Sequence, residues 1–97
     1  MEKNKINIGT TLTRNPNQVF NEIDGEVLML NVVNEEYYNL TGTAKIIWDI
    51  LANKTTLKDI VNKLANQYEI STEDCLTDVK SFLEKLINKG IVEISNA

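Results

Sequence analysis

The stretch GEVLMLNVVNEEYYNLTG, from Gly25 to Gly42, combines a nearly continuous apolar run, a polar break and a short run with two adjacent tyrosines. The apolar run over residues 26–32 is typical of a central strand that is covered on at least one face. Asn34-Glu35 predicts a turn into a further strand over residues 36–40. The stretch therefore predicts two antiparallel strands joined by a short connection.

The two tyrosines of this stretch cannot have the same environment. Side chains alternate between the faces of a strand, so Tyr38 and Leu40 share one face while Tyr37 and Asn39 share the other. If only one face of the sheet is covered, Tyr38 belongs to the core and Tyr37 lies on the surface.

A further strand is expected just before Gly25. Val19 and Ile23 lie on or near one face of a segment that ends in Asp24-Gly25, and this pair favours the positive backbone angles of a tight hairpin. The sequence thus predicts a three-stranded antiparallel meander.

After Gly42 the apolar pattern changes to the period of a helix that runs to about Ala52, with Thr41 or Thr43 available as its cap. The apolar residues of this first helix are Ala44, Ile47, Trp48 and Leu51. A capping sequence over residues 56–59 opens a second helix that stops near Glu69. Its apolar stripe consists of Leu57, Ile60, Val61, Leu64 and Tyr68.

The third helix is expected to be the longest. Residues 71–74 repeat the capping pattern, and Gly90 is a typical stop signal. Its apolar face carries Cys75, Val79, Phe82, Leu83 and Leu86. The β-branched segment 91–94 is compatible either with a final extended piece or with a tail packed on the core.

Strands followed by three helices define an α+β fold, and the nearest architecture is a winged helix-turn-helix. A chain of 97 residues is long enough for one domain with a single modest core. We expect residues 11–97 to form that domain and residues 1–10 to be flexible, because the segment Met1–Asn17 is polar and rich in Asn.

Composition excludes several classes of function. The net charge of −4 disfavours nucleic acid and anionic membranes as partners, and the chain has neither a long apolar run nor a signal peptide pattern, so we expect a cytoplasmic location. With one cysteine and no histidine, it lacks the residues for an internal disulfide or an ordinary zinc site. No glycine-rich phosphate loop or other cofactor motif occurs.

Candidate catalytic groups are also missing. Cys75 has no histidine or second cysteine to act as a base or a resolving partner. Glu35 and Glu36 are adjacent, so in a strand they point to opposite faces and make a poor acid/base pair. We therefore predict that the chain is not an enzyme.

Four successive segments, EIDGEVLMLN, EEYYNLTGTAKIIWDIL, TTLKDIVNKLANQYEIS and DVKSFLEKLINKGIV, resemble the PqqD-like domains, also called RiPP recognition elements. The resemblance covers roughly Thr11 to Ile94. Its most specific part is an aromatic strand that ends in Leu40, a turn of small residues, Ile47-Trp48, and Leu51 at the end of the first helix.

The resemblance implies a domain without catalytic activity or cofactor that binds the leader segment of a ribosomally made precursor peptide and presents it to a separate modifying or processing enzyme. The leader is expected to add as a strand beside residues 36–40 and to lie in a groove walled by the third helix. Lasso-peptide maturation with a separate leader peptidase is the first expectation for the pathway, and a radical-SAM system of the pyrroloquinoline-quinone type is the second. The implied peptide-binding residues are Glu36, Tyr37, Tyr38, Asn39, Leu40, Asp78, Val79, Phe82, Lys85 and Leu86.

Two other functions stay open on the sequence. The element order also suits a winged-helix DNA-binding regulator, although the start of the third helix carries Glu73, Asp74 and Asp78 and no basic residue. An adaptor that binds a folded partner protein is the other alternative. Whether two copies form a dimer by exchanging strands also stays open.

Overall fold

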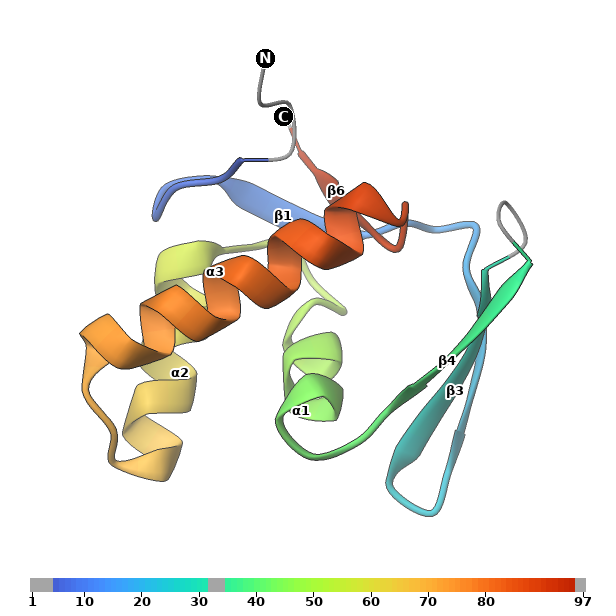
Figure 1. Ribbon diagram of the computed structural model, residues 1–97, viewed down its shortest axis with the longest axis horizontal. Coiled ribbons are helices and arrows are strands. Elements are labelled where there is room, and N and C mark those ends of the chain that lie inside the picture. Colours follow the sequence, from blue (N-terminus) through green and yellow to red (C-terminus); the bar gives the residue numbers. More distant parts are fainter. Residues whose placement is uncertain (1–4, 32–34, 96–97) are drawn as a thin grey trace.

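The computed structural model describes residues 5–31 and 35–95 (Figure 1). Within these ranges the chain forms three helices and six strands, and the strand-then-helix order of the predicted α+β fold is confirmed. The strands are β1 (Thr11–Arg14), β2 (Val19–Ile23), β3 (Glu26–Asn31), β4 (Glu36–Leu40), β5 (Thr55–Thr56) and β6 (Val92–Ile94). The helices are α1 (Gly42–Ile50), α2 (Leu57–Tyr68) and α3 (Thr72–Asn88).

The predicted meander is the sheet with the strand order β2-β3-β4. Its first turn consists of Asp24 and Gly25 with φ angles of 52° and 79°, so both residues adopt the positive angles that a two-residue hairpin turn requires. The registers place Val19 opposite Leu30, and Leu30 opposite Tyr37. The expected end of the second strand at Val32 and the turn residue Asn34 lie outside the described residues.

A second sheet, with the order β5-β1-β6, was not predicted. Leu12 is fully buried at its centre, opposite Thr55 on one side and Ile94 on the other. Residues 92–94 thus form a final strand, which decides between the two alternatives for this segment. The sheet lies beside α2 and α3, at the end of the molecule where the first and last strands meet (Figure 1).

Two helices begin with the predicted caps and one does not. The hydroxyl of Thr56 accepts from the amide of Asp59, and that of Ser71 accepts from the amide of Asp74, each over 3.2 Å. Thr41 occupies the cap position of α1, but its side chain makes no capping hydrogen bond. The expectation that a threonine side chain caps α1 is therefore wrong. The residue after Thr41 is Gly42, which has a φ angle of +56°.

The main core lies between α1, the longer helices and both sheets. Trp48 is 1% exposed, and Phe20 packs on it edge to face with ring centroids 5.2 Å apart. Arg14 joins β1 to this cluster because its Nε and Nη2 atoms donate to the carbonyl oxygen of Trp48 over 3.0 and 2.6 Å. Its guanidinium carbon lies 4.1 Å from the centroid of the Trp48 ring.

The start of the described chain is packed against α3. Ile6 is 4% exposed, and its amide donates to a carboxylate oxygen of Glu84 over 3.0 Å. Residues 1–4 lie outside the described residues, so the flexibility expected for residues 1–10 stays a prediction.

Candidate functional site

The site starts from β4, which lies at one end of its sheet. Among the described residues, β3 is the sole strand that pairs with β4. In a two-residue hairpin the residues that flank the turn, Ile23 and Glu26, form a hydrogen-bonded pair, and such pairs alternate along antiparallel strands. This alternation continues from the β2–β3 pairs to the β3–β4 pairs. The N–H and C=O groups of Tyr37 and Asn39 therefore point away from β3, toward the open edge.

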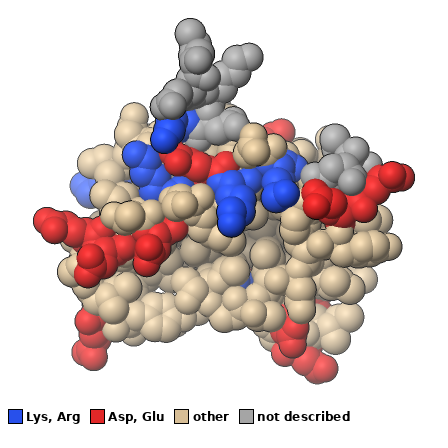
Figure 2. Space-filling view, in the orientation of Figure 1, with Lys and Arg blue, Asp and Glu red and all other residues tan. Residues whose placement is uncertain are grey.

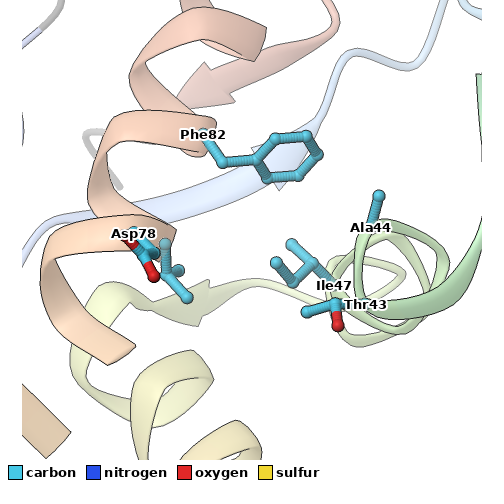
Figure 3. A pocket seen from close by; sticks show the side chains of 6 residues that line it. Thr43, Ala44, Ile47, Asp78 and Phe82 are labelled. Carbon is cyan, nitrogen blue, oxygen red and sulfur yellow. The ribbon is translucent and has the colours of Figure 1, made fainter. Parts of the chain in front are cut away.

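A hollow of about 320 Å³ lies between α1 and α3 (Figure 3). Thr43, Ala44 and Ile47 line it from the α1 side, and the α3 side consists of Asp78, Val79 and Phe82. Figure 3 shows the ring of Phe82 directed from α3 toward the space beside α1. The lining is thus mainly apolar, with one carboxylate on the α3 wall.

The C-terminal end of α3 is fixed to the sheet. The side-chain amide of Asn31, on β3, donates to the carbonyl oxygen of Lys89 over 2.6 Å. The ammonium group of Lys89 lies 3.6 Å from a carboxylate oxygen of Glu36 and 5.7 Å from the centroid of the Tyr38 ring. The start of β4 therefore contacts the C-terminal end of α3, and the two elements diverge from this point toward the hollow (Figure 1).

Charge differs between the hollow and its border. Figure 2 shows uncharged side chains over the lower centre of this face, basic side chains in a row above them, and acidic side chains at both sides. Helix α3 supplies Lys80 and Lys85 and is followed by Lys89. An extended ligand would thus meet an apolar floor and a basic border.

A second hollow adjoins the first at the N-terminal end of α1. This second hollow, of about 390 Å³, shares Thr43, Asp78 and Val79 with the first and extends to Tyr68 and Ile70. Tyr68 belongs to the predicted stripe of α2, but it is 43% exposed because the helix ends there at Glu69. This extension was not predicted from the sequence, although two large apolar residues beside a helix end are a signal for it.

The predicted site residues on α3 divide into two groups. Asp78, Val79 and Phe82 line the hollow, and Phe82 is half-buried. Leu86 is 4% exposed and belongs to the core, while Lys85 is exposed but is not among the residues that line the hollow. The α1 wall, which consists of Thr43, Ala44 and Ile47, was missed because its residues were assigned to a cap and a core stripe.

The predicted site residues on β4 divide by face, as their alternation required. Tyr38 is half-buried and Leu40 is buried, so both point toward the core. Tyr37 is 72% exposed and Asn39 is exposed on the opposite face. Glu36 accepts a hydrogen bond from the Tyr38 hydroxyl over 2.9 Å.

Cys75 is 3% exposed and is one of the residues that line the second hollow. Sγ donates to the carbonyl oxygen of Val61 over 3.7 Å. Burial raises the pKa of the Cys75 thiol, and the negative charge of Asp78 raises this pKa further. The thiol is therefore held in its protonated, unreactive form.

Over residues 5–31 and 35–95, no group of Asp, Glu and Cys side chains has the arrangement to hold a metal ion. In the same part of the chain, none of the helices has the length and hydrophobicity that crossing a membrane requires.

The fold and the site define an α+β domain in which, among the described residues, one edge of β4 has no partner strand and an apolar hollow lies between α1 and α3. The chain belongs to the PqqD family, since the model of that family, described as coenzyme PQQ synthesis protein D, matches residues 26–92. The predicted resemblance to PqqD-like domains is thereby confirmed. Among solved structures, the chain is similar to that described as TbiB1 in complex with the TbiA(beta) leader peptide, with a TM-score of 0.76 and 26% identity. The similarity covers 84% of this chain and 94% of TbiB1. No curated protein matches the chain.

Proposed function

We propose that the chain binds the leader region of a ribosomally synthesised precursor peptide as an added strand on β4 and delivers it to a separate maturation enzyme. The chain itself performs no catalysis in this proposal. The observation that carries it is the open edge of β4, where the main-chain groups of Tyr37 and Asn39 face away from β3, together with the apolar hollow between α1 and α3.

Main-chain pairing supplies the affinity. Tyr37 and Asn39 each present one N–H donor and one C=O acceptor at the edge, which is the pattern that an extended peptide needs to continue an antiparallel ladder. Binding of a leader peptide is supported by the structural similarity to TbiB1, whose structure is described as a complex with a leader peptide.

Side chains supply the selectivity. In the bound peptide, residues that point toward the protein would meet Phe82 and Ile47 in the hollow, so we expect apolar leader residues at these positions. Lys85 and Asp78 are exposed on α3 and would set the register by pairing with charges on the leader.

We propose two candidates for the partner enzyme. A leader peptidase of a lasso-peptide pathway is our first candidate, and a radical-SAM enzyme of the pyrroloquinoline-quinone type is the second. In either case the chain acts as a cytoplasmic binding protein that presents the precursor in an extended form.

The test is a titration of the protein into a fluorescently labelled leader peptide from the precursor encoded beside its gene. We expect saturable binding with a Kd of about 10 μM or tighter, which corresponds to about −7 kcal/mol. A scrambled leader of the same composition is the control. Equal binding of both peptides, or no binding of the native leader, would contradict the proposal.

A further inference from the structure

The face of the β2-β3-β4 sheet that points away from α1 exposes a continuous set of apolar side chains. Val19 and Ile23 are each 57% exposed, Leu28 is 47% exposed, and Tyr37 is 72% exposed. Leu30 lies between Val19 and Tyr37 in the register and is half-buried. These five side chains are called the outer face below. A contiguous apolar surface of this kind is typical of an interaction site.

The outer face also contains a hollow with a specific chemical character. The hollow, of about 210 Å³, is lined by Ile23, Leu28 and Asn39 together with the carboxylates of Asp24 and Glu26. Strands β2, β3 and β4 contain no Lys or Arg, so this part of the sheet supplies no cation to these carboxylates. The arrangement suits a Lys or Arg side chain whose aliphatic part packs on Ile23 and Leu28.

The outer face is continuous with the edge of β4. A strand added there would place the residues opposite Tyr37 and Asn39 on the same face as these two side chains, because directly paired residues share a face. A protein that docks on the outer face would therefore touch both the sheet and the bound peptide.

We propose that the outer face is the docking site for the maturation enzyme, through an enzyme surface with an apolar centre and basic side chains at its border. This inference rests on the proposed function, because the bound leader extends the outer face and gives the leader-loaded protein a surface that the empty protein lacks. Binding of the enzyme and of the leader is then mutually reinforcing, since each completes part of the surface that the other contacts.

A second copy of the chain fits this surface less well. In a symmetric dimer the same patch lies on both sides of the interface, so the acidic border formed by Asp24 and Glu26 would meet no Lys or Arg from β2, β3 or β4 of the other copy. Those carboxylates also disfavour an anionic membrane.

The experiment compares two variants with a matched control. Ile23→Thr/Leu28→Thr removes the apolar centre with β-branched residues that suit a strand, and Glu26→Lys reverses one charge without touching the apolar centre. Ile8→Thr is the control, because Ile8 is 54% exposed and lies outside this sheet. Each protein is measured for leader binding alone, and then, saturated with leader, for binding to a purified leader peptidase and to a purified radical-SAM enzyme from the same source.

We expect both variants to bind leader with a Kd within about twofold of the unmodified protein, and to bind one of the enzymes at least about tenfold more weakly, a loss of about 1.4 kcal/mol. The Ile8→Thr control should match the unmodified protein in both assays.

Full enzyme binding by both variants overturns the docking site, as does failure of the leader-loaded unmodified protein to bind either enzyme. Light scattering that shows a dimer of the unmodified protein and monomers of the variants would instead assign the face to a second copy. Absence of leader binding by the unmodified protein would contradict the proposed function itself. The assay of leader binding alone detects this outcome separately.

Discussion

The side-chain amide of Asn31 donates to the carbonyl oxygen of Lys89 over 2.6 Å and thereby joins the meander to the end of α3. Asn31 is completely buried, and Lys89 is also the residue that contacts Glu36 and Tyr38 at the start of β4. This hydrogen bond therefore fixes the C-terminal end of α3 to the sheet, next to the start of β4.

Replacement of Asn31 by Leu should lower the free energy of unfolding by about 1–3 kcal/mol, because the carbonyl oxygen of Lys89 loses a buried donor. It should also weaken leader binding, since the spacing between β4 and α3 is no longer fixed. Urea denaturation and the leader titration measure the two effects. Asn39→Ala is the control for stability and should change it by less than about 0.5 kcal/mol, because Asn39 is exposed.

The open edge is tested at Asn39. Its N–H points away from β3, so Asn39→Pro should leave the meander folded, as prolines are tolerated at strand edges, but remove one donor from the peptide ladder. We expect leader affinity to fall by about tenfold, or about 1.4 kcal/mol. Asn39→Ala keeps the amide and should bind nearly normally. Equal losses in the two variants would assign the effect to the side chain and contradict the edge geometry.

Phe82 and Leu86, one turn apart on α3, should behave differently. Leu86 is in the core, so Leu86→Ala should lower the free energy of unfolding by about 2–5 kcal/mol. Phe82 is half-buried and lines the hollow, so Phe82→Ala should reduce leader affinity at a smaller cost in stability. Circular dichroism and the leader titration, both at low temperature, separate the two effects. Normal leader affinity in Phe82→Ala would place the peptide outside this hollow.

Cys75 should be unreactive in the folded protein. Because its pKa is raised in the folded state, folding favours the protonated thiol; this contribution to stability is present below the ordinary thiol pKa of about 8.5 and is lost as the pH rises through the folded-state pKa. At pH 8, reaction with a disulfide reagent should be at least about tenfold slower than in the urea-unfolded chain. Cys75→Ala should remove this pH dependence of stability. Rapid reaction in the folded protein would show instead that the thiol is accessible.

The sequence predicted the elements whose signals are local. Asp24-Gly25 marked the hairpin, and Thr56 and Ser71 marked two helix starts because their hydroxyls cap nearby amides. The β5-β1-β6 sheet was missed because Thr11–Arg14 and Thr55–Thr56 are short and polar, and they pair only when distant parts of the chain meet.

Like the fold, the site was predictable from the sequence only in part. Alternation separated Tyr37 from Tyr38, but the helical period alone did not distinguish Phe82 at the hollow from Leu86 in the core, because both lie on the inward face of α3. The use of the third helix as a groove wall came from the family resemblance. The exposed outer face was not anticipated, since apolar residues such as Ile23 and Leu28 are usually assigned to the core.

The pairing of Leu12 with Ile94 brings the first and last strands of the domain side by side, and the amide of Ser95 donates to the carbonyl oxygen of Thr11 over 2.8 Å. Figure 1 shows these strands on the far side of α3 from the loop that leads from β4 into α1. Thr11 and Ser95 are thus held next to each other by the main chain, so the entry into β1 and the exit from β6 lie together on that side of the domain.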